Sequence, residues 1–72
     1  MANPGDRFIA QSVVPNVPSM EIVYRGTQKG FEDLPDMPLY DLTVDISGHP
    51  IGSTVTRCTL DSSGFVLPND AP

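Results

Sequence analysis

Residues 39–67 read LYDLTVDISGHPIGSTVTRCTLDSSGFVL, and the spacing of the apolar residues changes twice along this stretch. From Tyr40 to Ile46 every second residue is apolar, and the residues between them are aspartate or threonine. This alternation predicts a strand over residues 39–46 with one buried and one solvated face. The glycine-flanked His49-Pro50 pair predicts a turn, after which residues 53–56 form a short return strand.

A short helical turn is predicted next, over residues 57–63. Thr56 is a residue type that caps helix N-termini, and Gly64 stands where a helix C-terminus favours a left-handed residue. In this register Leu60 and Phe65 occupy the two positions that a Schellman motif brings into contact. About seven residues are too few for an isolated helix to persist, so the packing of Leu60 and Phe65 has to hold it. Phe65 also begins a last predicted strand, which Pro68 ends.

The N-terminal half contributes two more predicted strands. Residues 7–14 are apolar enough to form one, and residues 20–25 show a clearer alternation of apolar and polar positions. Gly26 is the expected end of the second strand. Residues 27–38 contain a glycine and two prolines, which favours an ordered surface loop over a single helical turn.

Length and composition bound the fold class. The chain has 72 residues and 39% hydrophobic content, which leaves room for one core. The prediction is therefore a mainly β, small α+β single domain, a β-barrel or β-roll of four to five short strands with one short helical turn. It spans residues 1–72, with tails at about 1–6 and 68–72. Residues 39–67 resemble SH3-like folds, a likeness that implies an architecture and no function.

Such a chain has few means of stabilisation. A core of this size usually gives a net stability of only about 3 to 5 kcal/mol. Cys58 is the only cysteine, so no internal disulfide forms, and together with the single histidine it cannot complete a structural zinc site. We therefore expect no cofactor or metal, and we expect stabilisation by association with a protein partner or by self-association.

The charge balance narrows the classes of partner. The net charge is −5, and the four Lys and Arg residues are too few and too scattered for a patch that follows phosphates. The sequence thus predicts no direct binding of nucleic acid. No apolar run approaches the length of a membrane span and no signal segment is visible, so we expect an intracellular, soluble, cytoplasmic protein without membrane contact. The unpaired cysteine agrees with a reducing compartment.

Carboxylates concentrate in the 27–38 loop and on the predicted strand 39–46. In the loop, an apolar triad spaced by three, which ends at Met37, lies among the acids, an arrangement typical of an anchor for a partner. On the strand, two aspartates are expected on one face, about 14 Å apart. The predicted partner-binding residues are Phe31, Glu32, Asp33, Leu34, Asp36, Asp41 and Asp45. The alternative interpretations are a loop that packs on the core and a strand face that is merely hydrated.

Three functions are compatible with these features. The predicted one is a small acidic non-enzymatic accessory or interaction protein that binds another protein. The first alternative is an acidic inhibitor, a decoy of viral type that mimics nucleic acid in a basic groove. The second is a thiol-dependent enzyme with Cys58 as nucleophile and His49 as base. Against that alternative, the local sequence favours His49 as a turn residue and Cys58 as a small buried filler.

Overall fold

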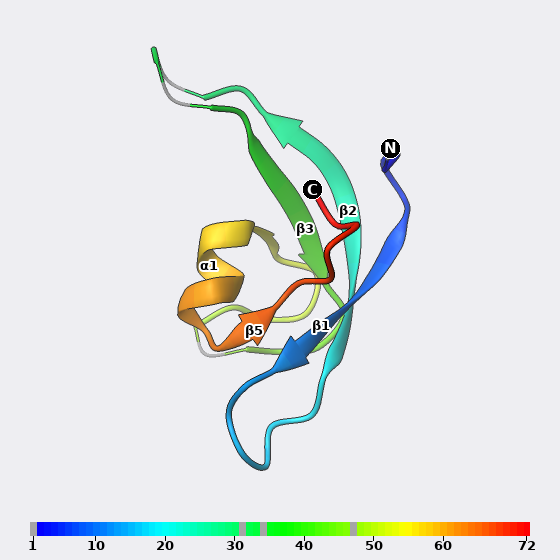
Figure 1. Ribbon diagram of the computed structural model, residues 1–72. Helices are drawn as coiled ribbons and strands as arrows, with labels where there is room; N and C mark the ends of the chain where they lie inside the picture. The colour runs from blue at the N-terminus through cyan, green and yellow to red at the C-terminus, as the bar shows by residue number, and fades with distance from the viewer. Residues whose placement is uncertain (1, 31, 34, 47) are drawn as a thin grey trace.

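The computed structural model describes residues 2–30, 32–33, 35–46 and 48–72. Five strands form an antiparallel sheet in the order β4-β3-β2-β1-β5, which curls into a half-barrel (Figure 1). The strands are β1 (Arg7–Ser12), β2 (Met20–Gln28), β3 (Met37–Leu42), β4 (Thr54–Thr56) and β5 (Phe65–Val66), and the helix α1 (Arg57–Ser62) joins β4 to β5. The predicted fold class, a small mainly β domain with one short helix, is confirmed.

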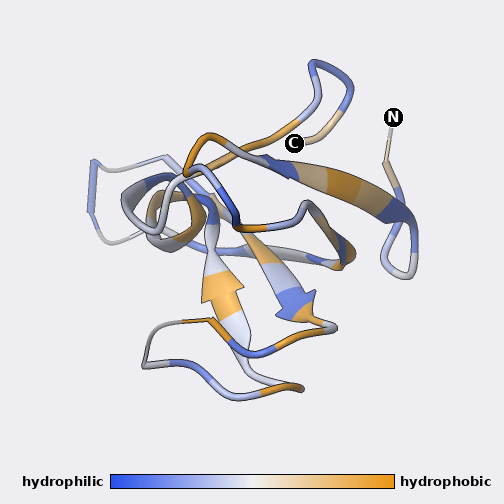
Figure 2. Cartoon of the chain, turned by 90° about the horizontal axis from the view of Figure 1, so that it is seen from below, coloured by the Kyte–Doolittle hydropathy of each residue, from blue (hydrophilic) through white to orange (hydrophobic). Residues whose placement is uncertain are grey.

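The core lies on the inner face of the curled sheet. Inward-facing residues meet across neighbouring strands, because Ile22 of β2 stands opposite both Phe8 and Leu42, and Tyr24 stands opposite Tyr40. Along β2 the buried residues Met20, Ile22 and Tyr24 alternate with residues that are less buried. Figure 2 shows that the strands carry both apolar and polar positions. The buried apolar residues are Ala10, Met20, Ile22, Tyr24, Tyr40, Leu42, Val55, Leu60, Phe65, Leu67 and Ala71.

The predicted helix caps are confirmed, and α1 ends at Ser62, one residue earlier than predicted. The Thr56 hydroxyl accepts a hydrogen bond from the Thr59 amide at 3.2 Å, which caps the N-terminus of α1. At the other end Gly64 has a φ of +90°, and its amide donates to the carbonyl of Asp61 at 3.1 Å. Leu60 and Phe65 are both buried in the same core cluster, as the helix needs in order to stay docked.

The predicted strand 39–46 is too long. β3 ends at Leu42, and Val44, which the alternation assigns to the core, is 43% exposed. The reason is the return limb of the chain: the Leu42 amide donates to the carbonyl of Ser53, and the Leu42 carbonyl accepts from the Gly52 amide. Because Leu42 already bonds to the return limb, β3 ends at this residue. The chain between Leu42 and Gly52 then connects β3 to the return limb.

The expectation that Gly26 ends the second strand was also wrong. β2 continues to Gln28, and its register against β3 shifts between Tyr24 and Gly26, which has a φ of +104°. Gly26 is therefore the site of a bulge within the strand. The loop is correspondingly shorter than predicted, because Gln28 already pairs with Met37.

The two segments predicted as tails both bond to the sheet. The Gly5 amide donates to the carbonyl of Tyr24 at 2.7 Å, and the Tyr24 amide donates to the carbonyl of Asp6 at 2.8 Å. At the other end Ala71 is only 8% exposed.

No helix among the described residues has the length and apolar composition that crossing a membrane requires.

Candidate protein-binding surface

The hairpin of β2 and β3 continues past its neighbours as an arm, defined here as residues 27–30, 32–33 and 35–38. Within the arm Thr27 pairs with Pro38, and Gln28 pairs with Met37. β1 pairs with β2 only over residues 20–23, and β4 pairs with β3 only over residues 39–41, so no other strand of the described chain reaches the arm. Figure 1 shows it projecting from the sheet on the side of α1. The arm helps to give the molecule extents of 38 × 22 × 22 Å.

A groove of about 460 Å³, the arm groove, runs between the arm and α1. Pro35, Met37 and Pro38 give it an apolar wall, and the Met37 residue is 37% exposed. From the helix side Cys58 contributes an exposed thiol. The full lining is Gln28, Lys29, Gly30, Pro35, Asp36, Met37, Pro38, Arg57 and Cys58.

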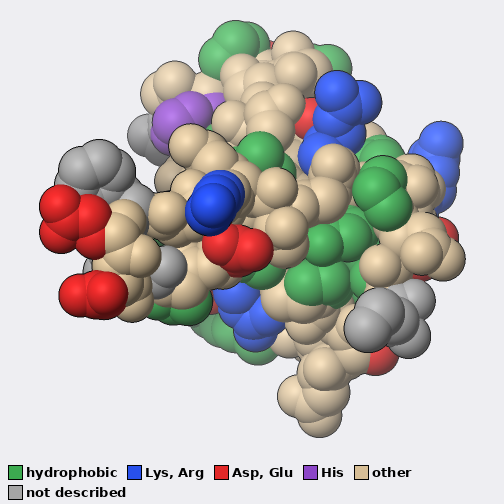
Figure 3. All heavy atoms as spheres, turned by 90° about the horizontal axis from the view of Figure 1, so that it is seen from above, with side chains coloured by type: hydrophobic (Ala, Val, Ile, Leu, Met, Phe, Trp, Pro, Cys, Tyr) green, Lys and Arg blue, Asp and Glu red, His purple; other side chains and the backbone are tan. Residues whose placement is uncertain are grey.

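Three of the predicted site residues cluster at this end of the molecule. Asp36 lines the arm groove, and its Oδ1 accepts the Gly30 amide at 3.1 Å, which ties the two limbs of the arm together. Glu32 and Asp33 are exposed, and no hydrogen bond between described residues engages their carboxylates. Figure 3 shows acidic side chains projecting at one margin of the molecule, while Lys and Arg side chains lie apart from one another. The other two predicted loop residues, at positions 31 and 34, lie outside the described residues.

Asp41 and Asp45 do not share the strand face that was predicted for them. Asp41 lies on β3, where it accepts the Thr54 hydroxyl at 2.6 Å and lies 3.4 Å from Nε of Arg25. Asp45 lies beyond the end of β3, and its Oδ1 accepts the Ile51 amide at 2.5 Å. Both carboxylates therefore have internal donors, which leaves them less available to an external partner.

The sequence did not predict a second hollow, of about 470 Å³, between the β1–β2 connection and residues 43–46. Val14, Val17 and Val44 line it and are each between 42% and 44% exposed. The apolar content of residues 7–14 had placed Val14 in a strand, and the alternation over residues 39–46 had placed Val44 in the core. The sequence did contain one indication that these valines lie outside a strand. Val14 and Val17 flank Pro15-Asn16, and a proline at this point prevents the strand from continuing.

Cys58 and His49 lie on different parts of the chain, the first on α1 and the second in the connection after β3. Cys58 is exposed on α1, so its predicted role as a buried filler was wrong. The backbone of His49 pairs with that of Ile46 in the connection after β3, and His49 is not among the residues that line the arm groove. Within the described residues no three His, Cys, Asp or Glu side chains are grouped as a metal site would need.

The fold perturbs the pKa of Tyr40. Burial raises the pKa of its phenol above the ordinary value of 10.0, the nearby Arg57 guanidinium lowers it in part, and Tyr24 raises it further. The folded protein therefore favours the neutral phenol more strongly than the unfolded chain does.

This pKa shift predicts a loss of stability in alkali. Because the unfolded chain releases the Tyr40 proton first, the contribution of Tyr40 to the free energy of unfolding should be constant below about pH 9 and should fall as the pH rises above about 10. Urea unfolding at a series of pH values measures it. Tyr40→Phe should flatten the alkaline limb, whereas Tyr24→Phe should keep most of it, because burial is the largest cause of the raised Tyr40 pKa and Tyr24 the smallest. An equal effect of both substitutions would contradict the assignment.

Comparison of the chain with protein-family models, with curated proteins and with solved structures finds no match.

Proposed function

We propose that this chain is a small non-enzymatic accessory protein that binds another protein through its arm and the arm groove. The observation that carries the proposal is the projecting arm itself, a ribbon that closes an apolar groove against α1 with Met37 exposed at the wall. Methionine is enriched at protein interfaces, and a flexible apolar side chain adapts to the surface that it meets. An apolar centre with a charged margin is the common composition of such interfaces.

The charge of the arm indicates what kind of partner fits. The exposed Glu32 and Asp33 lie on the arm, and the whole chain carries a net charge of −5. Of the two cations that line the arm groove, Arg57 donates to main-chain oxygens of Ala71 and Pro72. A partner segment with apolar residues for the groove and basic residues for the margin is therefore the complementary one.

The exposed thiol of Cys58 offers a direct test. A bulky maleimide attached to it fills the arm groove, so the labelled protein should lose at least about tenfold in affinity for a partner isolated from the native source. The matched control is the Cys58→Ser/Ile51→Cys variant with the same label. Ile51 is 64% exposed and does not line the arm groove, so this protein should bind like the wild type. Sedimentation of both labelled proteins extends the test to a partner that is a second copy of the chain.

The outcomes separate the three functions. If both labelled proteins bound the partner equally well, the arm groove would not be part of the interface. Binding that collapses at high salt and yields to competing DNA would favour the acidic decoy, whereas binding that survives high salt favours an apolar contact. A catalytic activity that Cys58→Ser abolishes would favour the enzyme.

A further inference from the structure

The segment after β5, residues 68–72, is called the strap here. It belongs to no strand and passes between β1 and β3 over the inner face of the half-barrel (Figure 1). A turn shapes it, in which the Ala71 amide donates to the carbonyl of Pro68 at 3.0 Å. The turn places Ala71 in the core cluster that also contains Tyr24 and Tyr40. The strap therefore fills a cleft whose walls are provided by other elements.

Two side chains bind the backbone of the strap. A main-chain oxygen of Pro72, the last residue of the sequence, accepts the Tyr40 hydroxyl at 2.6 Å and the Arg57 Nη1 at 2.7 Å. The same guanidinium nitrogen reaches the carbonyl oxygen of Ala71 at 3.3 Å. Tyr40 lies on β3 and Arg57 on α1, so donors from two separate elements converge on one end of the strap. Such contacts recognise the backbone of a peptide. The side chains of the peptide are then selected by the room that the cleft leaves for them.

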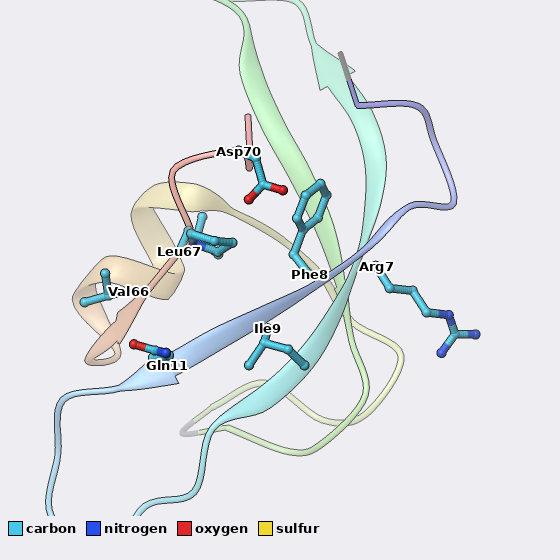
Figure 4. Close-up of a pocket in the computed structure, with 8 residues that line it drawn as sticks. Arg7, Phe8, Ile9, Gln11, Val66, Leu67 and Asp70 are labelled. Atoms are coloured by element: carbon cyan, nitrogen blue, oxygen red, sulfur yellow. The ribbon is translucent and has the colours of Figure 1, made fainter.

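Aromatic rings form the floor of this cleft. Tyr40 packs edge-on against Phe8, with ring centroids 6.5 Å apart, and tilts against Tyr24 at 5.6 Å. Phe8 borders a groove of about 340 Å³ between β1 and the strap, lined on the other side by Leu67, Pro68 and Asp70. In Figure 4 the Phe8 side chain rises from β1 toward the segment that carries Asp70, whereas Arg7 points away. A small apolar side chain fits this floor, as Ala71 does.

We propose that the cleft of Phe8, Tyr24, Tyr40 and Arg57 is a peptide-binding site that the strap occupies in cis. Its external ligand is a segment of another polypeptide with the chemistry of residues 67–72, an apolar residue and proline followed, three positions on, by alanine and proline. The occupant already seated there defines that chemistry. Prolines in the ligand reduce the entropy lost on binding, and a tethered strap competes at an effective concentration in the millimolar range. This site is separate from the arm groove, although Arg57 borders both.

The test uses the full chain carrying Ala71→Asp. A carboxylate cannot enter the apolar cleft without a large desolvation cost, so the strap should be expelled and the thermal midpoint should fall. The probe is the hexapeptide Leu-Pro-Asn-Asp-Ala-Pro, acetylated at its N-terminus so that it carries no charge that residues 67–72 lack. At millimolar concentration it should restore the midpoint of the variant. The wild type should bind it at least about tenfold more weakly, because its own strap competes.

Two matched controls define the site. The hexapeptide with aspartate in place of alanine should have no effect, and Arg57→Gln in the Ala71→Asp chain should weaken peptide binding about tenfold by removing a charged donor. If Ala71→Asp is unfolded alone, refolding by the hexapeptide supports the proposal, and failure to refold overturns it. A folded Ala71→Asp chain that does not bind the hexapeptide also overturns it.

Discussion

Leu60→Ala should lower the free energy of unfolding by about 2 to 5 kcal/mol, which approaches the whole net stability expected of a domain this small. Leu60 is fully buried, and it is the one core residue that α1 contributes. The substitution removes apolar contacts and leaves a cavity under the helix. Intrinsic helix propensity does not offset this loss, because alanine and leucine are both good helix formers. With the anchor gone, α1 is too short to persist alone.

Urea unfolding followed by circular dichroism measures the effect. Asp61→Ala is the matched control, since Asp61 is the next residue of α1 and is exposed. It should change the free energy of unfolding by less than about 0.5 kcal/mol. Leu60→Met, which conserves volume, should cost less than about 1.5 kcal/mol. If Leu60→Ala were no more harmful than Asp61→Ala, the helix would not be held by its packing on the sheet.

The features that the sequence predicted correctly are those encoded by adjacent residues. The alternation of Met20, Ile22 and Tyr24 marks β2, because side chains of a strand point to opposite faces in turn. The boundaries of α1 follow from Thr56 and Gly64, whose roles depend only on the hydrogen bonds of one helical turn. Such local patterns need no knowledge of the remaining fold.

The features that the sequence missed depend on partners far along the chain. Val44 continues the apolar alternation, yet β3 ends at Leu42 because the return limb bonds there. Gly26 looks like a strand end, but pairing with β3 converts it into a bulge. The segment from Pro68 to Pro72 has the composition of a tail, and only the aromatic floor beneath it explains why Ala71 is buried.

The candidate site also has some features that the sequence predicts and others that depend on the fold. The sequence alone indicates that acidic residues and an apolar methionine gather on a surface loop. It does not indicate the internal bonds of Asp41 and Asp45, because their donors on Arg25, Thr54 and Ile51 are brought near by the fold. Nor does the sequence indicate that Cys58 faces a groove, since the second wall of that groove comes from the arm.

Gly64→Ala should also be strongly damaging, with a loss of about 2 to 5 kcal/mol. Its left-handed φ of +90° costs an L-residue about 1 to 2 kcal/mol. In addition, an added Cβ would lie 2.8 Å from Cγ2 of Val14, closer than carbon atoms pack, and relieving such overpacking costs about 1 to 3 kcal/mol. The contact matters for the fold because it joins the end of α1 to the segment after β1, where the Val13 amide donates to the Gly64 carbonyl at 2.8 Å.

Gly52→Ala separates the two contributions to this loss. Gly52 has a similar φ of +87°, but an added Cβ there meets nothing within 4 Å, so only the backbone cost of about 1 to 2 kcal/mol should remain. Val14→Ala combined with Gly64→Ala should recover the steric part, which makes the two substitutions non-additive by at least about 0.5 kcal/mol. Urea unfolding of the four proteins of this cycle measures the coupling. If the two substitutions were additive, and Gly64→Ala were no worse than Gly52→Ala, the close approach of Val14 to Gly64 would not constrain the fold, and backbone conformation alone would account for the glycine.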